Sequence, residues 1–139
     1  MIGYESSRQL GLLQEAGFTE APPTNPVLTR RIAGRDVRLT LTIDAIQELE
    51  RETGRGIGEL MKRLAVMDFS TSDIIHVIRI ALMAGGESKA VALAVSWHFV
   101  AARPADYVRM ASDVLTAAFA GLDPEAAPDD AEDGASKKA

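Results

Sequence analysis

The segment from Thr71 to Ala84 constrains the fold more than any other part of the sequence. After its first turn the segment is apolar except at His76 and Arg79. A helix that is apolar around most of its circumference needs cover on several sides, from its own domain or from a partner. Ser70 is a good N-cap with Asp73 at N3, so the start of this helix is well marked. The chain is therefore predicted to arrange its other elements around one central helix.

Apolar residues at helical spacing predict four further helices. Their expected bounds are about 45–53, 57–67, 88–102 and 104–120. The first is expected to start at Asp44, with Gln47 completing a capping-box-like pair. The 88–102 helix should present Val91, Val95, His98, Phe99 and Ala102 on one side.

A β-hairpin is predicted over residues 27–43, before the helices. Strands are expected at 27–32 and 37–43, because Val37 to Ile43 alternates apolar and polar residues. Residues 33–36, which include Gly34, supply the turn. The predicted fold class is mainly α (α+β), with this hairpin followed by a compact bundle of about four to five helices. The hairpin and helices together form one domain over residues 27–121.

Both ends are predicted to lie outside this domain. Residues 1–26 are interpreted as a flexible leader that can hold a short helix over 6–16, ahead of three prolines in 22–26. The alternative is a short docking segment that packs on the body or on a partner. Residues 122–139 contain six acids and two lysines without apolar periodicity, and they are predicted to be an acidic disordered tail.

Composition restricts the classes of function. The chain has no cysteine, which excludes disulfides and thiol catalysis. Residues 27–121 contain 12 basic and 11 acidic side chains, so the body lacks the positive surface typical of proteins that bind nucleic acid. No apolar run is long enough for a membrane span, and no secretory signal is seen at the start. The expected location is therefore the cytoplasm, with association to a particle as a further option.

No pattern in the sequence predicts a catalytic residue, a metal site or a bound cofactor. His76 and His98 lie in different helices, without the spacing of metal ligands. The glycines of 54–58 link two predicted helices, whereas a phosphate loop follows a strand, so a flexible turn is the preferred interpretation. We expect a binding protein that is not an enzyme.

Several motifs, in this order and spacing, resemble one family. They are Arg30–Leu39 at the hairpin, Ala45–Gly56 at the first helix and its end, the serine- and aspartate-led start at 69–75, and Ala81–Gly86. The order resembles the tail proteins of gene transfer agents and siphophages that are labelled tail tube protein or tail assembly chaperone. The resemblance covers about residues 28–121.

This resemblance implies a non-enzymatic role in building a phage-like tail. A chaperone of this kind binds the tape measure protein, tail tube subunits or both. The alternative is a structural tail subunit that stays in the particle, and a third option is an unrelated helical regulatory domain. The sequence favours the chaperone, since tail tube proteins normally need a β-rich body to form rings and one hairpin is too little.

The partner implied by the resemblance is an amphipathic helix or an exposed strand, received by an apolar groove. Methionine suits such a groove because its side chain is flexible and polarisable. Met61, Met67 and Met83 lie on or beside predicted helices and are candidate partner-binding residues, although methionine at helical spacing also serves cores. Trp97, the one tryptophan, is a fourth candidate with core packing as its alternative role.

Overall fold

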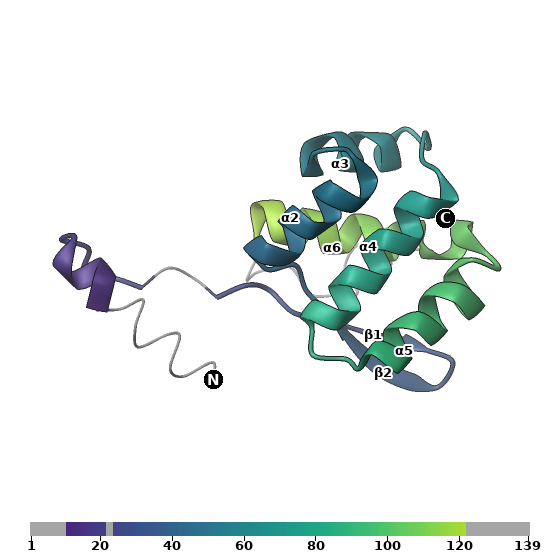
Figure 1. The fold of residues 1–139 in the computed structure, drawn as a ribbon, viewed down its shortest axis with the longest axis horizontal. Coiled ribbons are helices and arrows are strands. Elements are labelled where there is room, and N and C mark those ends of the chain that lie inside the picture. Colours follow the sequence, from purple (N-terminus) through teal and green to yellow (C-terminus); the bar gives the residue numbers. More distant parts are fainter. Residues whose placement is uncertain (1–10, 22–23, 122–139) are drawn as a thin grey trace, which may run out of the picture.

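The computed structural model describes residues 11–21 and 24–121, and it confirms the mainly helical fold with an N-terminal hairpin (Figure 1). The predicted acidic tail, 122–139, and residues 1–10 of the predicted leader lie outside the described residues. Within the described part, no helix is long and apolar enough to cross a membrane. The elements run in the order β1 (Leu28–Ile32), β2 (Arg35–Leu39), α2 (Ile43–Thr53), α3 (Ile57–Ala65), α4 (Thr71–Ala84), α5 (Lys89–Ala94), the π-helix η1 (Val95–Val100), the 3-10 helix η2 (Pro104–Tyr107) and α6 (Val108–Ala120).

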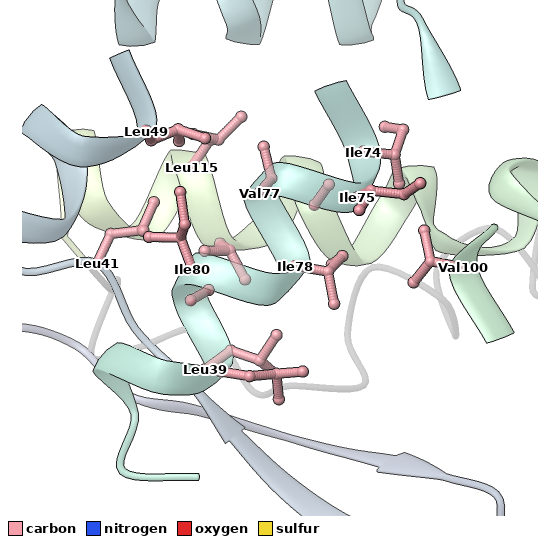
Figure 2. Packing of buried hydrophobic residues seen from close by; sticks show 14 of the residues in the cluster. Leu39, Leu41, Leu49, Ile74, Ile75, Val77, Ile78, Ile80, Val100 and Leu115 are labelled. Carbon is pink, nitrogen blue, oxygen red and sulfur yellow. The ribbon is translucent and has the colours of Figure 1, made fainter. Parts of the chain in front are cut away.

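The helix α4 is the centre of the core. It contacts β2, α2, α5, η1 and α6, and eight of its fourteen residues are buried. Figure 2 shows its side chains with Leu39 of β2, Leu115 of α6 and Val100 of η1 around them. Burying each isoleucine of this helix contributes about 1.5–3 kcal/mol. The neighbouring elements of the chain thus supply the cover that this apolar helix needs.

A capping box fixes the start of α4, as the sequence predicts. The Asp73 N–H donates to the Ser70 hydroxyl at 3.1 Å, and the Ser70 N–H donates to the Asp73 carboxylate at 3.1 Å. The same carboxylate accepts a hydrogen bond from Arg55 at 3.0 Å. Asp73 is buried, and these donors satisfy its charge.

The hairpin is tighter than predicted. Its turn has two residues, Ala33 and Gly34, both with positive φ (53° and 82°), as a type I′ turn requires. β2 therefore starts at Arg35, two residues before its expected start. It ends at Leu39 because the Thr40 N–H donates to the carbonyl of Ala81 at the end of α4.

Two helix boundaries in the first half differ from the prediction. The N-cap of α2 is Thr42, whose hydroxyl accepts from the Ala45 N–H at 3.2 Å, so the helix starts before Asp44. α3 ends at Ala65 because Met67 adopts a positive φ of 61° and the Asp68 N–H returns to the Arg63 carbonyl. In both cases a hydrogen bond donated by a backbone N–H, to a side chain at α2 and to a carbonyl at α3, sets the boundary independently of the apolar pattern.

The predicted 88–102 helix is present, but it becomes a π-helix in its second half, and the predicted buried side is wrong there. After α5 the chain forms η1, in which the Ala101 N–H donates to the carbonyl of Ser96, five residues earlier. The wider turn rotates the buried side, so Val95, Ser96 and Val100 face the core. His98, Phe99 and Ala102, which were expected to lie on one side with Val95, are exposed.

The predicted 104–120 helix also divides in two. Pro104 begins the helical stretch, as expected of a residue that suits the first helical position, but the first turn is the 3-10 helix η2. Regular α-helix starts at Val108 and ends at Ala120. Ala111, Val114 and Leu115 of α6 are buried as their spacing predicts.

A short segment at the N-terminal side carries helix within residues 11–15, inside the predicted 6–16. Gly17 follows with φ 98°, and the Phe18 N–H donates to the Leu13 carbonyl at 2.9 Å, a Schellman-type end. Leu12 and Phe18 are 62% and 61% exposed. The alternative that this segment packs on its own body is therefore not what the structure shows.

Candidate partner-binding surfaces

The four candidate residues lie on separate parts of the surface. Met61 of α3 is half-buried against the core, and Met67 is exposed in the loop after α3. Met83 is 44% exposed near the end of α4, and Trp97 is 59% exposed on η1. No one groove contains all four. Core packing, the alternative role of Trp97, does not fit its exposure.

Met83 lines an open depression between α2 and α4, which we call the α2–α4 depression. Its apolar floor includes Ile80 and Ala45, and Asp44 and Glu48 lie at its rim. Ile43, beside the rim at the first position of α2, is largely exposed. The sequence pattern missed Ile43, because a longer second strand placed it on a buried strand face. The complete lining consists of Thr42, Asp44, Ala45, Glu48, Ile80, Met83 and Ala84.

A second apolar surface lies on α5 and the start of η1, and we call it the α5–η1 face. Leu93 and Trp97 are exposed and lie four residues apart, on the same side of the helix. Lys89 continues this side by one turn toward the start of α5. The exposed small residues Ala90 and Ala94 flank the row. Leu93 was not singled out from the sequence. Because it precedes Trp97 by four residues, helical spacing would have identified it as a neighbour if Trp97 had been assigned to the surface.

The start of the α5–η1 face is positively charged. Glu87 accepts from Arg35 at 2.8 Å, and it lies 3.9 Å from Arg38. Both arginine side chains are more than half exposed, while the Glu87 side chain is nearly buried. Two arginines thus share this one carboxylate, and the exposed Lys89 follows two residues further along the chain. The local field therefore favours an acidic neighbour.

The two edges of the hairpin differ in their accessibility. The outer edge of β2 is covered, since the Arg38 N–H donates to the Glu87 carboxylate at 2.9 Å and Gly85 lies against the Arg38 backbone. The five-residue β1 carries Arg30 and Arg31, and charged residues on a short edge strand oppose pairing with another strand. The described sheet has two strands only.

The structure gives His76 a hydrogen-bond partner within its own helix. His76 shares a hydrogen bond with Arg79 within α4 at 3.0 Å. Among the described residues, no group of three histidine, aspartate or glutamate side chains is placed to hold a metal ion.

The 54–56 turn was expected to be flexible. In the structure, hydrogen bonds to side chains hold it in place. Arg55 donates to Asp73, and the Glu50 carboxylate accepts from the Ile57 N–H at 3.0 Å, capping the start of α3. The backbone N–H at the start of α3 is thus already bonded to a carboxylate of the chain itself.

Comparison with known protein families identifies a match, whereas the other comparisons find none. No curated protein and no solved structure matches this chain. A protein family described as "Phage tail tube protein, GTA-gp10" matches residues 26–121, which is well over half of the 139 residues and includes every element from β1 to α6. The chain therefore belongs to this family of phage tail proteins.

Proposed function

We propose that this protein is a non-enzymatic tail assembly chaperone, which binds a tail component during assembly of a phage-like particle. Family membership supports the broader statement, a structural or morphogenetic role in such a tail. The finer assignment depends on whether the body is suited to build a tube or to hold a partner. Two features of the described body favour holding a partner.

The observation that carries the proposal is the covered edge of a very small sheet. A tube built from β-rich subunits needs sheet edges that can continue from one subunit to the next. Here the β2 edge is occupied by Glu87 and by the end of α4, and β1 carries Arg30 and Arg31. The body offers helical surface for contacts instead.

The α2–α4 depression is the proposed partner site. An amphipathic helix buries its apolar side in a groove between helices, and flexible methionine adapts to it. Met83 and Ile80 offer the apolar contact. Asp44 and Glu48 at the rim favour a partner segment with lysine or arginine beside its apolar residues. By the resemblance, the partner is the tape measure protein, with tail tube subunits as the second component.

The alternative is a structural subunit that remains in the particle. It is favoured by the description of the matching family, which is that of a tail tube protein. In that case the apolar surfaces would be buried against neighbouring subunits permanently.

Quantitative mass spectrometry of purified particles and of assembling cells separates the two functions. A chaperone should be abundant in cell extracts, should co-purify with the tape measure protein, and should be absent from finished particles. Recovery of the chain from finished particles in amounts comparable to the tube subunit would contradict the proposal and establish the structural alternative.

A further inference from the structure

Large apolar side chains are exposed to solvent in residues 11–21, which we call the N-terminal arm. The arm stands clear of the helices of the body in Figure 1. Leu12 and Phe18, at 62% and 61% exposure, offer an apolar side next to the carboxylates of Glu15 and Glu20. The arm has no basic residue, so its charge is −2. Its helix end at Gly17 is well formed, with the Phe18 N–H bonded to Leu13, so Phe18 projects from a defined turn.

Charge distinguishes the two apolar surfaces of the body as docking sites for this arm. The α2–α4 depression carries Asp44 and Glu48 at its rim, and like charges placed together oppose binding. The α5–η1 face has Leu93 and Trp97 exposed. At its start are three basic residues, Arg35 and Arg38, which pair with Glu87, and the exposed Lys89. The arm is acidic and has two large apolar side chains. It therefore matches the α5–η1 face both in charge and in exposed apolar surface.

The exposure of the arm indicates which copy of the chain it can serve. Leu12 and Phe18 are largely exposed, so they do not cover the α5–η1 face of their own body. Leu93 and Trp97 of that face are exposed as well. The apolar side chains of the arm and of this face are therefore both available to another molecule.

We propose that the N-terminal arm of one copy docks on the α5–η1 face of a second copy. Leu12 and Phe18 cover Leu93 and Trp97, and Glu15 and Glu20 face the cluster of Arg35, Arg38 and Lys89. If both copies exchange arms, the contact closes as a symmetric dimer. This inference is independent of the chaperone function, because it concerns the protein alone.

The test uses the full chain in a concentration series from about 1 to 200 µM. Sedimentation velocity measures the mass, and fluorescence reports on Trp97, the only tryptophan. We expect the mass to rise from monomer to dimer and the emission maximum to move to shorter wavelength over the same range, as the indole leaves water. A second series at about 0.5 M salt should shift the midpoint to higher concentration, because the charged part of the contact is screened.

The variants separate the arm from other surfaces. Leu12→Ser with Phe18→Ser should abolish both changes, and Leu93→Ser should abolish the dimer. Phe119→Ser removes an equally exposed aromatic side chain on α6 and should leave both changes intact. Glu15→Lys with Glu20→Lys should raise the dissociation constant at least tenfold.

Three results would overturn the inference. The first is a monomer at every concentration, and the second is a dimer that survives removal of the arm's apolar side chains. The third is a short-wavelength emission that does not change with dilution while the mass stays monomeric, because the arm would then occupy its own body.

Discussion

At the residue scale, Gly85 allows the end of α4 to lie directly against β2. A Cβ at this position would lie 2.7 Å from the carbonyl carbon of Arg38, which is backbone and cannot rotate away. The φ of Gly85 is −78°, an ordinary value, so only space requires glycine here. Gly58, in the first turn of α3, has no atom within 4 Å of its Cβ position.

These two glycines give opposite predictions for the same substitution. Gly85→Ala should lower the free energy of unfolding by about 2 kcal/mol, because the strand and helix must separate. Gly58→Ala should raise it by about 0.5 kcal/mol, since alanine has the higher helix propensity. Urea denaturation at 25 °C measures both. A Gly85→Ala variant as stable as the parent would show that α4 and β2 are not held at this distance.

Two serines in the α5–η1 segment have opposite hydrogen-bonding states. The Ser96 hydroxyl is fully buried and finds no partner among the described residues. The Ser88 hydroxyl caps α5 by accepting from the Val91 N–H at 3.1 Å. A buried hydroxyl without a partner costs about 1–3 kcal/mol.

Replacing each serine with alanine should therefore change stability in opposite directions. Ser96→Ala should raise the free energy of unfolding by about 1 kcal/mol, because an unpaired polar group leaves the core. Ser88→Ala should lower it by about 1 kcal/mol through the loss of the N-cap. Thermal and urea unfolding should agree in sign. Destabilisation by Ser96→Ala would mean that the hydroxyl has a partner after all.

At the element scale, what could be predicted from the sequence depended on the range of the interactions. The N-cap of α4 was predicted because Ser70 directly precedes the apolar segment and Asp73 follows at N3. The π-helix in the second half of the predicted 88–102 helix was not predicted. A π turn has no recognisable pattern of apolar residues, and this one depends on packing against α4. Trp97 was placed among candidates by residue type alone. Ile43 was missed because the end of β2 is set by a hydrogen bond to Ala81, distant in sequence.

The central role of α4 gives the third prediction. Ile78→Asp should prevent folding, since a carboxylate at a fully buried position costs several kcal/mol without a partner. Met83→Asp, on the same helix but 44% exposed, should fold with a loss below about 1 kcal/mol. Circular dichroism and urea unfolding would distinguish the two. Cooperative unfolding of the Ile78→Asp protein would show that this side of α4 does not face the core.

At the scale of the whole molecule, charge is distributed unevenly between the body and the ends. Residues 27–121 are near neutral, with 12 basic and 11 acidic side chains, while residues 122–139 carry six acids and two lysines. A near-neutral body attracts partners only weakly over long distances. Most of the affinity for a partner helix must then come from apolar contact at the α2–α4 depression, with Asp44 and Glu48 contributing locally.

The final prediction concerns binding of a tape measure segment at this depression. Because apolar burial dominates, binding should show a negative heat-capacity change. Exposed ion pairs contribute about 0.2–1 kcal/mol each, so two rim pairs allow at most roughly a thirtyfold loss of affinity between about 0.1 and 0.5 M salt. Isothermal titration at two temperatures and two salt concentrations measures both quantities.

Two methionine variants locate the site in the same experiment. Met83→Gln keeps the size of the side chain but removes apolar contact worth about 1–2 kcal/mol, so binding should weaken about tenfold. Met67→Gln changes an exposed methionine outside the depression and should bind like the parent. Equal loss in both variants would place the partner elsewhere. A hundredfold loss of affinity at high salt would show that charge, and not the apolar floor of the depression, holds the partner.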